Sequence, residues 1–247
     1  MQSYCNTNCL HCPKNPACPI CNRSRMHRKK VRRFRQDPLE DRGALDPTTQ
    51  FGLRIAADFI IVQKLSSGKE HRVQVIRDEY SGRVRAYPMF KRDAAYDNPF
   101  VMIKSDQAAE TKLACKQLAC EFEGSLENRL LHNAALELDI RTLQEVTHAC
   151  HLQAGFDIVP GLWIHSVEFA ATMLNAKHIA SGNTETRHKL ATGSEFNGRE
   201  LLLGQLVHYR VDPLQRGKFD ASSKPGLFCG WRYDSGPRPF KNVLRFG

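Results

Sequence analysis

Residues 54–90 read RIAADFIIVQKLSSGKEHRVQVIRDEYSGRVRAYPMF, and this stretch decides the fold. It predicts three short strands, because apolar residues first run together and then alternate with polar ones. The first strand is the apolar run Ile55–Val62, which is interrupted only by Asp58. Ser67-Gly68 and Ser81-Gly82 supply residues that favour tight turns between the strands. The stretch therefore indicates three short strands joined by two tight turns.

Asp58 is the unusual residue of this sheet, because it lies in the middle of an apolar strand. Burying a lone carboxylate costs several kcal/mol at least, roughly the scale of a lost buried ion-pair partner. Such an acid usually has a partner, which can be a backbone donor, a basic side chain or a metal ion. We therefore treat Asp58 as a candidate functional residue.

Two further acids lie downstream in comparable positions. Phe100–Ser105 predicts another apolar strand, and Asp106 follows it directly. His132–Ala154 has apolar residues at helical spacing, with Glu137 on its first turns. Acids on a strand, at a strand end and on a helix can converge at one sheet edge and hold two Mg²⁺ or Mn²⁺ ions. A metal pair about 3.5–4 Å apart can activate a water or a 3′-hydroxyl for in-line phosphoryl displacement.

Composition narrows the class of protein. The 247 residues are 41% hydrophobic, which allows a sizeable core and more than one module. No apolar run reaches the roughly 18 residues of a membrane helix, so we expect no membrane partner. We find no G-x-x-x-x-G-K-[ST] phosphate loop, no G-x-S-x-G elbow and no paired-histidine zinc hydrolase motif. Nine cysteines, an odd number, argue against a disulfide framework and favour a reducing intracellular compartment.

The net charge of +10 is concentrated at the N-terminus. Residues 1–36 contain nine of the 36 Lys and Arg residues and no acid, which leaves 27 bases against 26 acids elsewhere. Such an arm suggests a polyanionic partner, because each neutralised phosphate releases condensed counterions. The alternative is a solvated basic tail. The candidate nucleic-acid-binding residues are Arg23, Arg25, Arg28, Lys29, Lys30, Arg32, Arg33 and Arg35.

Residues 1–22 predict a zinc knuckle. Cys18 and Cys21 form a Cys-x₂-Cys pair, and His11 lies seven residues before Cys18. A Cys-x₂-Cys turn can present two thiolates to one Zn²⁺ ion, which prefers four tetrahedral ligands. The remaining ligand stays open among Cys5, Cys9 and Cys12, and a redox-active or free cysteine cluster is the alternative. Because Pro13, Pro16 and Pro19 disfavour a helix, we expect a site built from loops.

The rest of the chain predicts helices followed by a small β module. We expect helices over residues 108–120 and 161–178, a mobile loop over residues 121–131 and a linker over residues 180–198. From Glu200 onward, short strands separated by Gly and Pro predict a small β-barrel. Trp231 and Arg232 can contact nucleic acid there, although such an aromatic residue more often closes a small core.

Six segments resemble the integrase region of a copia-type LTR retrotransposon Pol polyprotein, of the kind common in dinoflagellate genomes. Their order along one chain is more specific than any single motif. The segments are HCPKNPACPICNRSRM (11–26), IAADFIIV (55–62), VIRDEYSGRVRAYP (75–88), IKSDQAAE (103–110), HNAALELDIRTLQE (132–145) and GKFDASSKPGLFCGW (217–231).

The resemblance implies an α/β protein with a ribonuclease-H-like integrase core at residues 50–180. Residues 1–36 would be the zinc knuckle and basic arm, and residues 198–247 a small C-terminal β-barrel-like module. Asp58, Asp106 and Glu137 would be the D,D,E ligands of two Mg²⁺ or Mn²⁺ ions, with Zn²⁺ in the knuckle. The implied reactions are 3′-end processing of element DNA and its strand transfer into target DNA. The implied partners are element ends, target DNA, RNA as a further nucleic acid, and other copies of the chain, in the nucleus after a cytoplasmic particle stage.

Two departures from the family pattern keep other functions open. Lys91–Asn98 is too short for the helix that the family places between its third and fourth strands, which indicates an internal deletion. Thr7 stands where the family has its first zinc histidine. A degenerate copy that only binds nucleic acid is therefore the main alternative. A nuclease of different specificity on the same scaffold is another.

Overall fold

The protein is seen here in a computed structural model that describes most of the chain. The described residues are 17–24, 48–63, 69–89, 101–105, 109–124, 134–155, 161–179, 183–211, 214, 216–218 and 221–231. The expected connector over residues 91–98 lies outside them.

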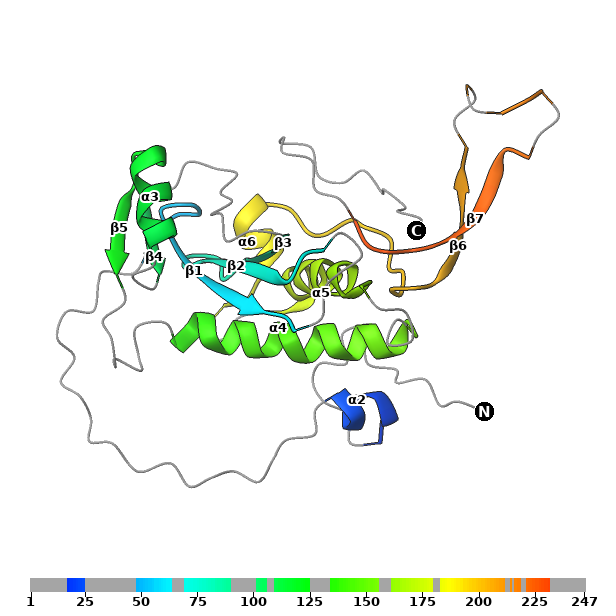
Figure 1. Ribbon diagram of the computed structural model, residues 1–247, viewed down its shortest axis with the longest axis horizontal. Helices are drawn as coiled ribbons and strands as arrows, with labels where there is room; N and C mark the ends of the chain where they lie inside the picture. Colours follow the sequence, from blue (N-terminus) through cyan, green and yellow to red (C-terminus); the bar gives the residue numbers. More distant parts are fainter. Residues whose placement is uncertain are drawn as a thin grey trace.

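A five-stranded mixed sheet forms the centre of the molecule (Figure 1). Its order is β3-β2-β1-β4-β5, and the bounds are β1 Arg54–Ile61, β2 Arg72–Asp78, β3 Val84–Met89, β4 Met102–Ser105 and β5 Glu121–Gly124. The strands β1, β2 and β3 pair antiparallel, whereas β4 and β5 continue the sheet in parallel with β1. The three strands predicted from residues 54–90 match this arrangement, and so do the Ser81-Gly82 turn and the fourth strand. The predicted Ser67-Gly68 turn lies outside the described residues. The predicted mixed α/β architecture is confirmed.

Helices cover both faces of the sheet. On one face α4 (Ala134–Gln153) and α5 (Trp163–Lys177) pack on alternate residues of the strands, among them Ala56, Val73 and Val75. On the other face α3 (Ala109–Leu118) contributes Cys115 to a smaller core with Ile55, Ala57, Ile76 and Ile103. The period-two alternation along β1 thus divides its side chains between two cores.

Three local elements differ from the sequence-based expectation. Residues 121–124, expected in a mobile loop, form β5, because parallel pairing with β4 provides hydrogen bonds that no local pattern reveals. Residues 187–192, expected in a linker, form α6 (Arg187–Thr192), which Thr186 caps by accepting a hydrogen bond from the Lys189 amide. Residues 19–24 form α2 (Pro19–Ser24) rather than a loop. Proline at the first helical position is compatible with a helix, since that amide needs no partner.

The C-terminal region has a two-stranded sheet of β6 (Leu206–Arg210) and β7 (Ser223–Leu227). This hairpin projects from the body of the molecule (Figure 1). Its flanking residues do not form a separate core: Leu203, Phe228 and Trp231 are buried in the same cluster as α5. The remaining strand expected for a barrel, residues 242–246, lies outside the described residues.

No helix within the described ranges has both the length and the apolar character needed to cross a membrane.

Candidate metal centre

Asp58 lies on the face of the sheet that α4 covers. Side chains alternate along β1, so Asp58 shares its face with Ala56 and Ile60, which belong to the larger core. Residues 55–57 of the strand are buried, whereas Asp58 and the two residues after it are half-buried. Its Oδ1 atom accepts a hydrogen bond of 2.7 Å from the Phe59 amide. One partner expected for this acid, a backbone donor, is therefore present.

Glu137 lies in the first turn of α4 and is exposed. The neighbouring residues Leu136 and Leu143 are buried and hold the helix on the sheet. A carboxylate in a first helical turn is favoured by the positive end of the helix dipole. The helix thus presents Glu137 at an edge of its buried stripe.

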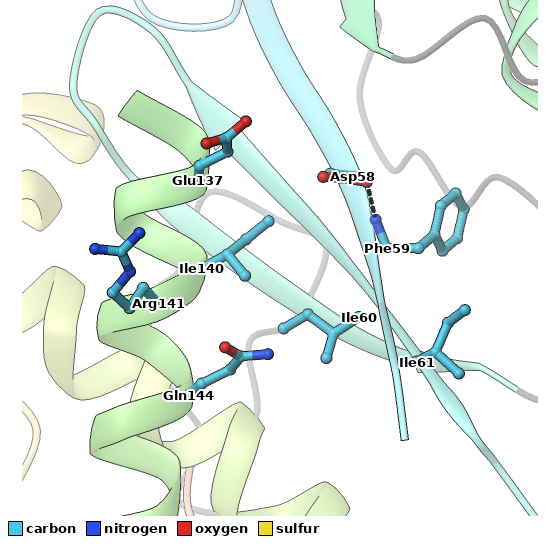
Figure 2. Close-up of a pocket in the computed structure, with 8 residues that line it drawn as sticks. All are labelled: Asp58, Phe59, Ile60, Ile61, Glu137, Ile140, Arg141 and Gln144. Atoms are coloured by element: carbon cyan, nitrogen blue, oxygen red, sulfur yellow. Dashed lines mark hydrogen bonds between the residues drawn. The ribbon is translucent and has the colours of Figure 1, made fainter. Parts of the chain in front are cut away.

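Asp58 and Glu137 line one pocket of about 360 Å³ between β1 and α4. Figure 2 shows Asp58 on β1 and Glu137 on α4 on opposite sides of this pocket, with the Glu137 carboxylate directed toward the start of the helix. Ile60 and Ile140 provide an apolar wall, and Arg141 and Gln144 continue the lining along α4. The guanidinium of Arg141 extends along the helix flank, away from Asp58 (Figure 2). The polar groups that border the pocket between β1 and α4 are therefore the two carboxylates and the Gln144 amide, whereas the charged end of Arg141 points away from it.

The chemistry of these donors fits a hard divalent cation. Carboxylate oxygens are the ligands that Mg²⁺ and Mn²⁺ prefer, and Mg²⁺ is commonly held by one or two of them together with water and substrate phosphates. Within the described residues no group of three His, Cys, Asp or Glu side chains could hold a metal ion. The third expected ligand, Asp106, lies outside those residues and directly follows Ser105, the last residue of β4.

The cysteines of the predicted zinc knuckle are in part visible. Cys18 and Cys21 are buried and carry no disulfide. Cys18 directly precedes α2 and Cys21 lies within it, and α2 contacts α4. The other predicted ligand, His11, and the candidates Cys5, Cys9 and Cys12 lie outside the described residues. The zinc site remains a prediction.

The basic arm is described at one residue only. Arg23 is exposed in α2. The other residues of the predicted set lie outside the described residues, namely Arg25, Arg28, Lys29, Lys30, Arg32, Arg33 and Arg35. Trp231, the candidate for nucleic-acid stacking, is buried in the main core rather than in a small core of the C-terminal module, which was the alternative expectation.

Two pocket residues were not found by sequence reasoning. Arg141 and Gln144 follow Glu137 by four and seven residues, which places all three along one side of a helix. Polar residues on an exposed helix face are common, so neither residue type stands out in the sequence. The spacing from Glu137 is the signal that could have identified them.

Comparisons with known proteins find resemblance in structure alone. No protein-family model matches the chain, and no curated protein matches it. A simian T-cell lymphotropic virus intasome, solved by cryoEM with PP2A regulatory subunit B56 gamma, is similar at 14% identity and a TM-score of 0.49, over 75% of this chain and 72% of that one. The HTLV-2 integrase catalytic core domain with magnesium, in its trimeric form, gives 12% identity and a TM-score of 0.42, over 57% and 97%. The catalytic core domain of BIV integrase gives 14% and 0.40, over 57% and 95%.

Proposed function

We propose that this chain is an integrase-like polynucleotidyl transferase that uses a two-metal D,D,E site to process and insert DNA. The observation that carries the proposal is that two carboxylates, Asp58 from a central strand and Glu137 from the first turn of α4, line one pocket. Both are among the three acids that stand out in the sequence pattern. They come from segments that are 79 residues apart.

The register of the sheet supports Asp106 as the third ligand. β4 runs parallel to β1 as its direct neighbour, and Ala56 pairs with Lys104. Asp58 is two residues beyond Ala56, and Asp106 is two residues beyond Lys104. Equal steps along neighbouring parallel strands favour a common position at the sheet edge. We propose that the three carboxylates hold the metal ions together.

Each residue has a defined task in this proposal. Asp58, Asp106 and Glu137 would hold the ions. The bound Mg²⁺ or Mn²⁺ ions supply Lewis acidity for the attacking and leaving oxygens. Arg141 offers a guanidinium for a phosphate of the DNA backbone, which is the geometry that arginine suits best. Ile60 and Ile140 limit the access of water along one wall of the pocket.

The basic arm and the cysteines extend the proposal beyond the pocket. We propose that residues 23–35 neutralise DNA phosphates, that Cys18, Cys21 and His11 bind Zn²⁺, and that several copies assemble on element ends in the nucleus. The copia-type retrotransposon origin belongs to the same proposal, on the strength of the six sequence segments.

A plasmid-nicking assay tests the catalytic proposal. Purified protein is incubated with Mn²⁺ and supercoiled plasmid, and the relaxed form is measured over time. We expect Asp58→Asn and Glu137→Gln each to lower the rate by at least about 100-fold, since loss of mere outer-shell support costs 10–100-fold at metal sites. The matched control is Glu121→Gln, an exposed acid of β5 outside the pocket, which should retain the wild-type rate.

Other outcomes separate the alternatives. Cleavage restricted to an RNA–DNA hybrid would identify a nuclease instead of a DNA strand transferase. Salt-sensitive DNA binding that survives Asp58→Asn, is lost on removing residues 1–36 and occurs without nicking would identify a nucleic-acid-binding remnant. Nicking that is equal in wild type and Asp58→Asn would refute the assigned site.

A further inference from the structure

A buried carboxylate on α4 lies between two arginines from different elements. Asp139 accepts a hydrogen bond of 2.7 Å from Arg77 Nε of β2 on one oxygen, and one of 2.7 Å from Arg187 Nη2 of α6 on the other. The side chains of Asp139 and Arg187 are 8% and 7% exposed, and that of Arg77 is 17% exposed. One side chain thus connects helix, sheet and a second helix.

This arrangement is not explained by stability alone. A buried ion pair is weak support for a fold, since apolar side chains of similar volume can replace it at no loss. Arg187 also leaves Nε and Nη1 without a hydrogen-bond partner among the described residues, which is a cost. The two hydrogen bonds to Asp139 instead fix the orientation of its side chain, because hydrogen bonds weaken steeply when they are misaligned.

The position of Asp139 relates it to the pocket. It follows Glu137 by two residues, so the two side chains are about 200° apart around the helix axis at 3.6 residues per turn. Arg77 pairs with Ala56 of β1, two residues before Asp58. The bond to Arg77 therefore joins the helix that carries Glu137 to the strand beside the one that carries Asp58.

Rotation of α4 would separate the two pocket carboxylates. A side-chain tip lies about 5–6 Å from the axis of a helix, so a rotation of about 20° moves it by about 2 Å. Mg²⁺ requires oxygen ligands at about 2.0–2.1 Å in near-ideal geometry. The apolar contacts of Leu136 and Leu143 hold the helix on the sheet, but apolar packing carries no comparable directional preference.

We propose that Asp139 is a positioning residue, which sets the rotation of α4 through Arg77 and Arg187 and so holds Glu137 at the pocket that it shares with Asp58. The inference rests on the proposed metal site. In this proposal the buried charges of Asp139, Arg77 and Arg187 affect metal affinity indirectly, through the position of α4. Neither arginine contacts the metal ions.

The test compares two destabilised variants of the full chain. Asp139→Asn removes the charge at nearly constant shape. Asn175→Ala removes the amide of α5 that accepts a hydrogen bond of 2.8 Å from Val84 N and donates one of 2.6 Å to Val84 O, so both of these bonds go to β3. Mn²⁺ affinity is measured by calorimetric titration, and hydrogen exchange is followed in residues 134–140.

We expect Asp139→Asn to bind Mn²⁺ at least about 10-fold more weakly, as for lost outer-shell partners, and to exchange faster over residues 134–140. Asn175→Ala should lower the melting temperature by a similar amount but keep the Mn²⁺ affinity within about twofold of the wild-type value. The reason is that a substitution which shares no partner with the metal site does not couple to it energetically. If Asp139→Asn fails to fold, Arg77→Lys decides, since it keeps the charge and loses the Nε donor.

The outcomes separate the two proposals. Equal affinities in Asp139→Asn and Asn175→Ala would overturn the positioning role and leave the metal site intact. Wild-type protein that binds Mn²⁺ no better than Asp58→Asn would instead overturn the metal site itself, and the positioning role with it.

Discussion

Replacing Trp231 by alanine tests whether the C-terminal segment is part of the core. The indole is 7% exposed and stacks on Phe169 of α5 at 5.8 Å between ring centroids, with an interplanar angle of 15°. It also meets Phe228 at 4.7 Å and Phe196 at 5.3 Å, both edge to face. Trp231 therefore links the last described residues to the helix behind the sheet.

The expected cost follows from these contacts. Large aromatic-to-alanine changes in cores cost about 3–5 kcal/mol, and each aromatic pair is worth about 0.5–1.5 kcal/mol beyond area burial. With three pairs lost at an almost fully buried position, we expect the upper half of that range, about 4–5 kcal/mol. Against a typical total of about 5–15 kcal/mol, the variant still folds but unfolds at much lower urea.

Urea unfolding followed by circular dichroism at 222 nm measures this loss, because the signal comes mainly from α4 and α5. The control Leu214→Ala changes a side chain that is 94% exposed and should stay within about 0.5 kcal/mol of wild type. A loss below about 1 kcal/mol for Trp231→Ala, or an early transition that leaves the helical signal unchanged, would refute the shared core.

Two further predictions concern single residues. Ala119 adopts φ 53° after α3, a left-handed conformation that costs an alanine about 1 kcal/mol relative to glycine. Ala119→Gly should therefore raise the free energy of unfolding, measured by urea titration, by that amount. An unchanged or lower free energy of unfolding would contradict this prediction. Burial, and then the charge of Arg83, lowers the pKa of His188 below 6.5. The unfolded chain then binds the proton first, so stability is full above about pH 6.5 and falls as the pH drops from there toward the folded pKa. His188→Phe should reduce the loss of melting temperature between about pH 7.5 and 5.5, whereas the exposed His208→Asn should not; equal losses in both variants would show that His188 is not responsible.

The parts of the fold that sequence reasoning found are those with a local physical signature. The alternation of apolar residues and the Ser81-Gly82 turn predict β2 and β3, and the structure has Gly82 at φ 67° in that turn. The apolar spacing of α4 predicts its buried stripe in the same way. The short strand β5 has no such signature, because its hydrogen bonds come from β4, one of its four residues is exposed and the other three are only partly buried.

The residues of the candidate site also differ in whether a local sequence pattern could reveal them. Asp58 was identifiable because an acid interrupts an apolar strand, and Glu137 because it begins a helix with a clear apolar stripe. Asp139 was not, because its two partners are 62 and 48 residues away and only the tertiary fold brings them together. An acid at helical spacing from another acid is ordinary in sequence, and its burial between arginines cannot be read from local pattern.

The pocket joins two elements that differ in how firmly they are held. Asp58 belongs to β1, where it pairs with Val75 of β2, and the pairing of β1 with β4 extends as far as Ala56, two residues before it. These pairings fix the backbone position of the strand. Glu137 belongs to the first turn of a helix, where backbone amides lack intrahelical partners and fraying begins. Any variation in the separation of the two carboxylates must therefore come mainly from the helix. It follows that contacts near the start of α4, and above all those of Asp139, should control metal affinity more strongly than changes of equal energetic cost elsewhere in the core.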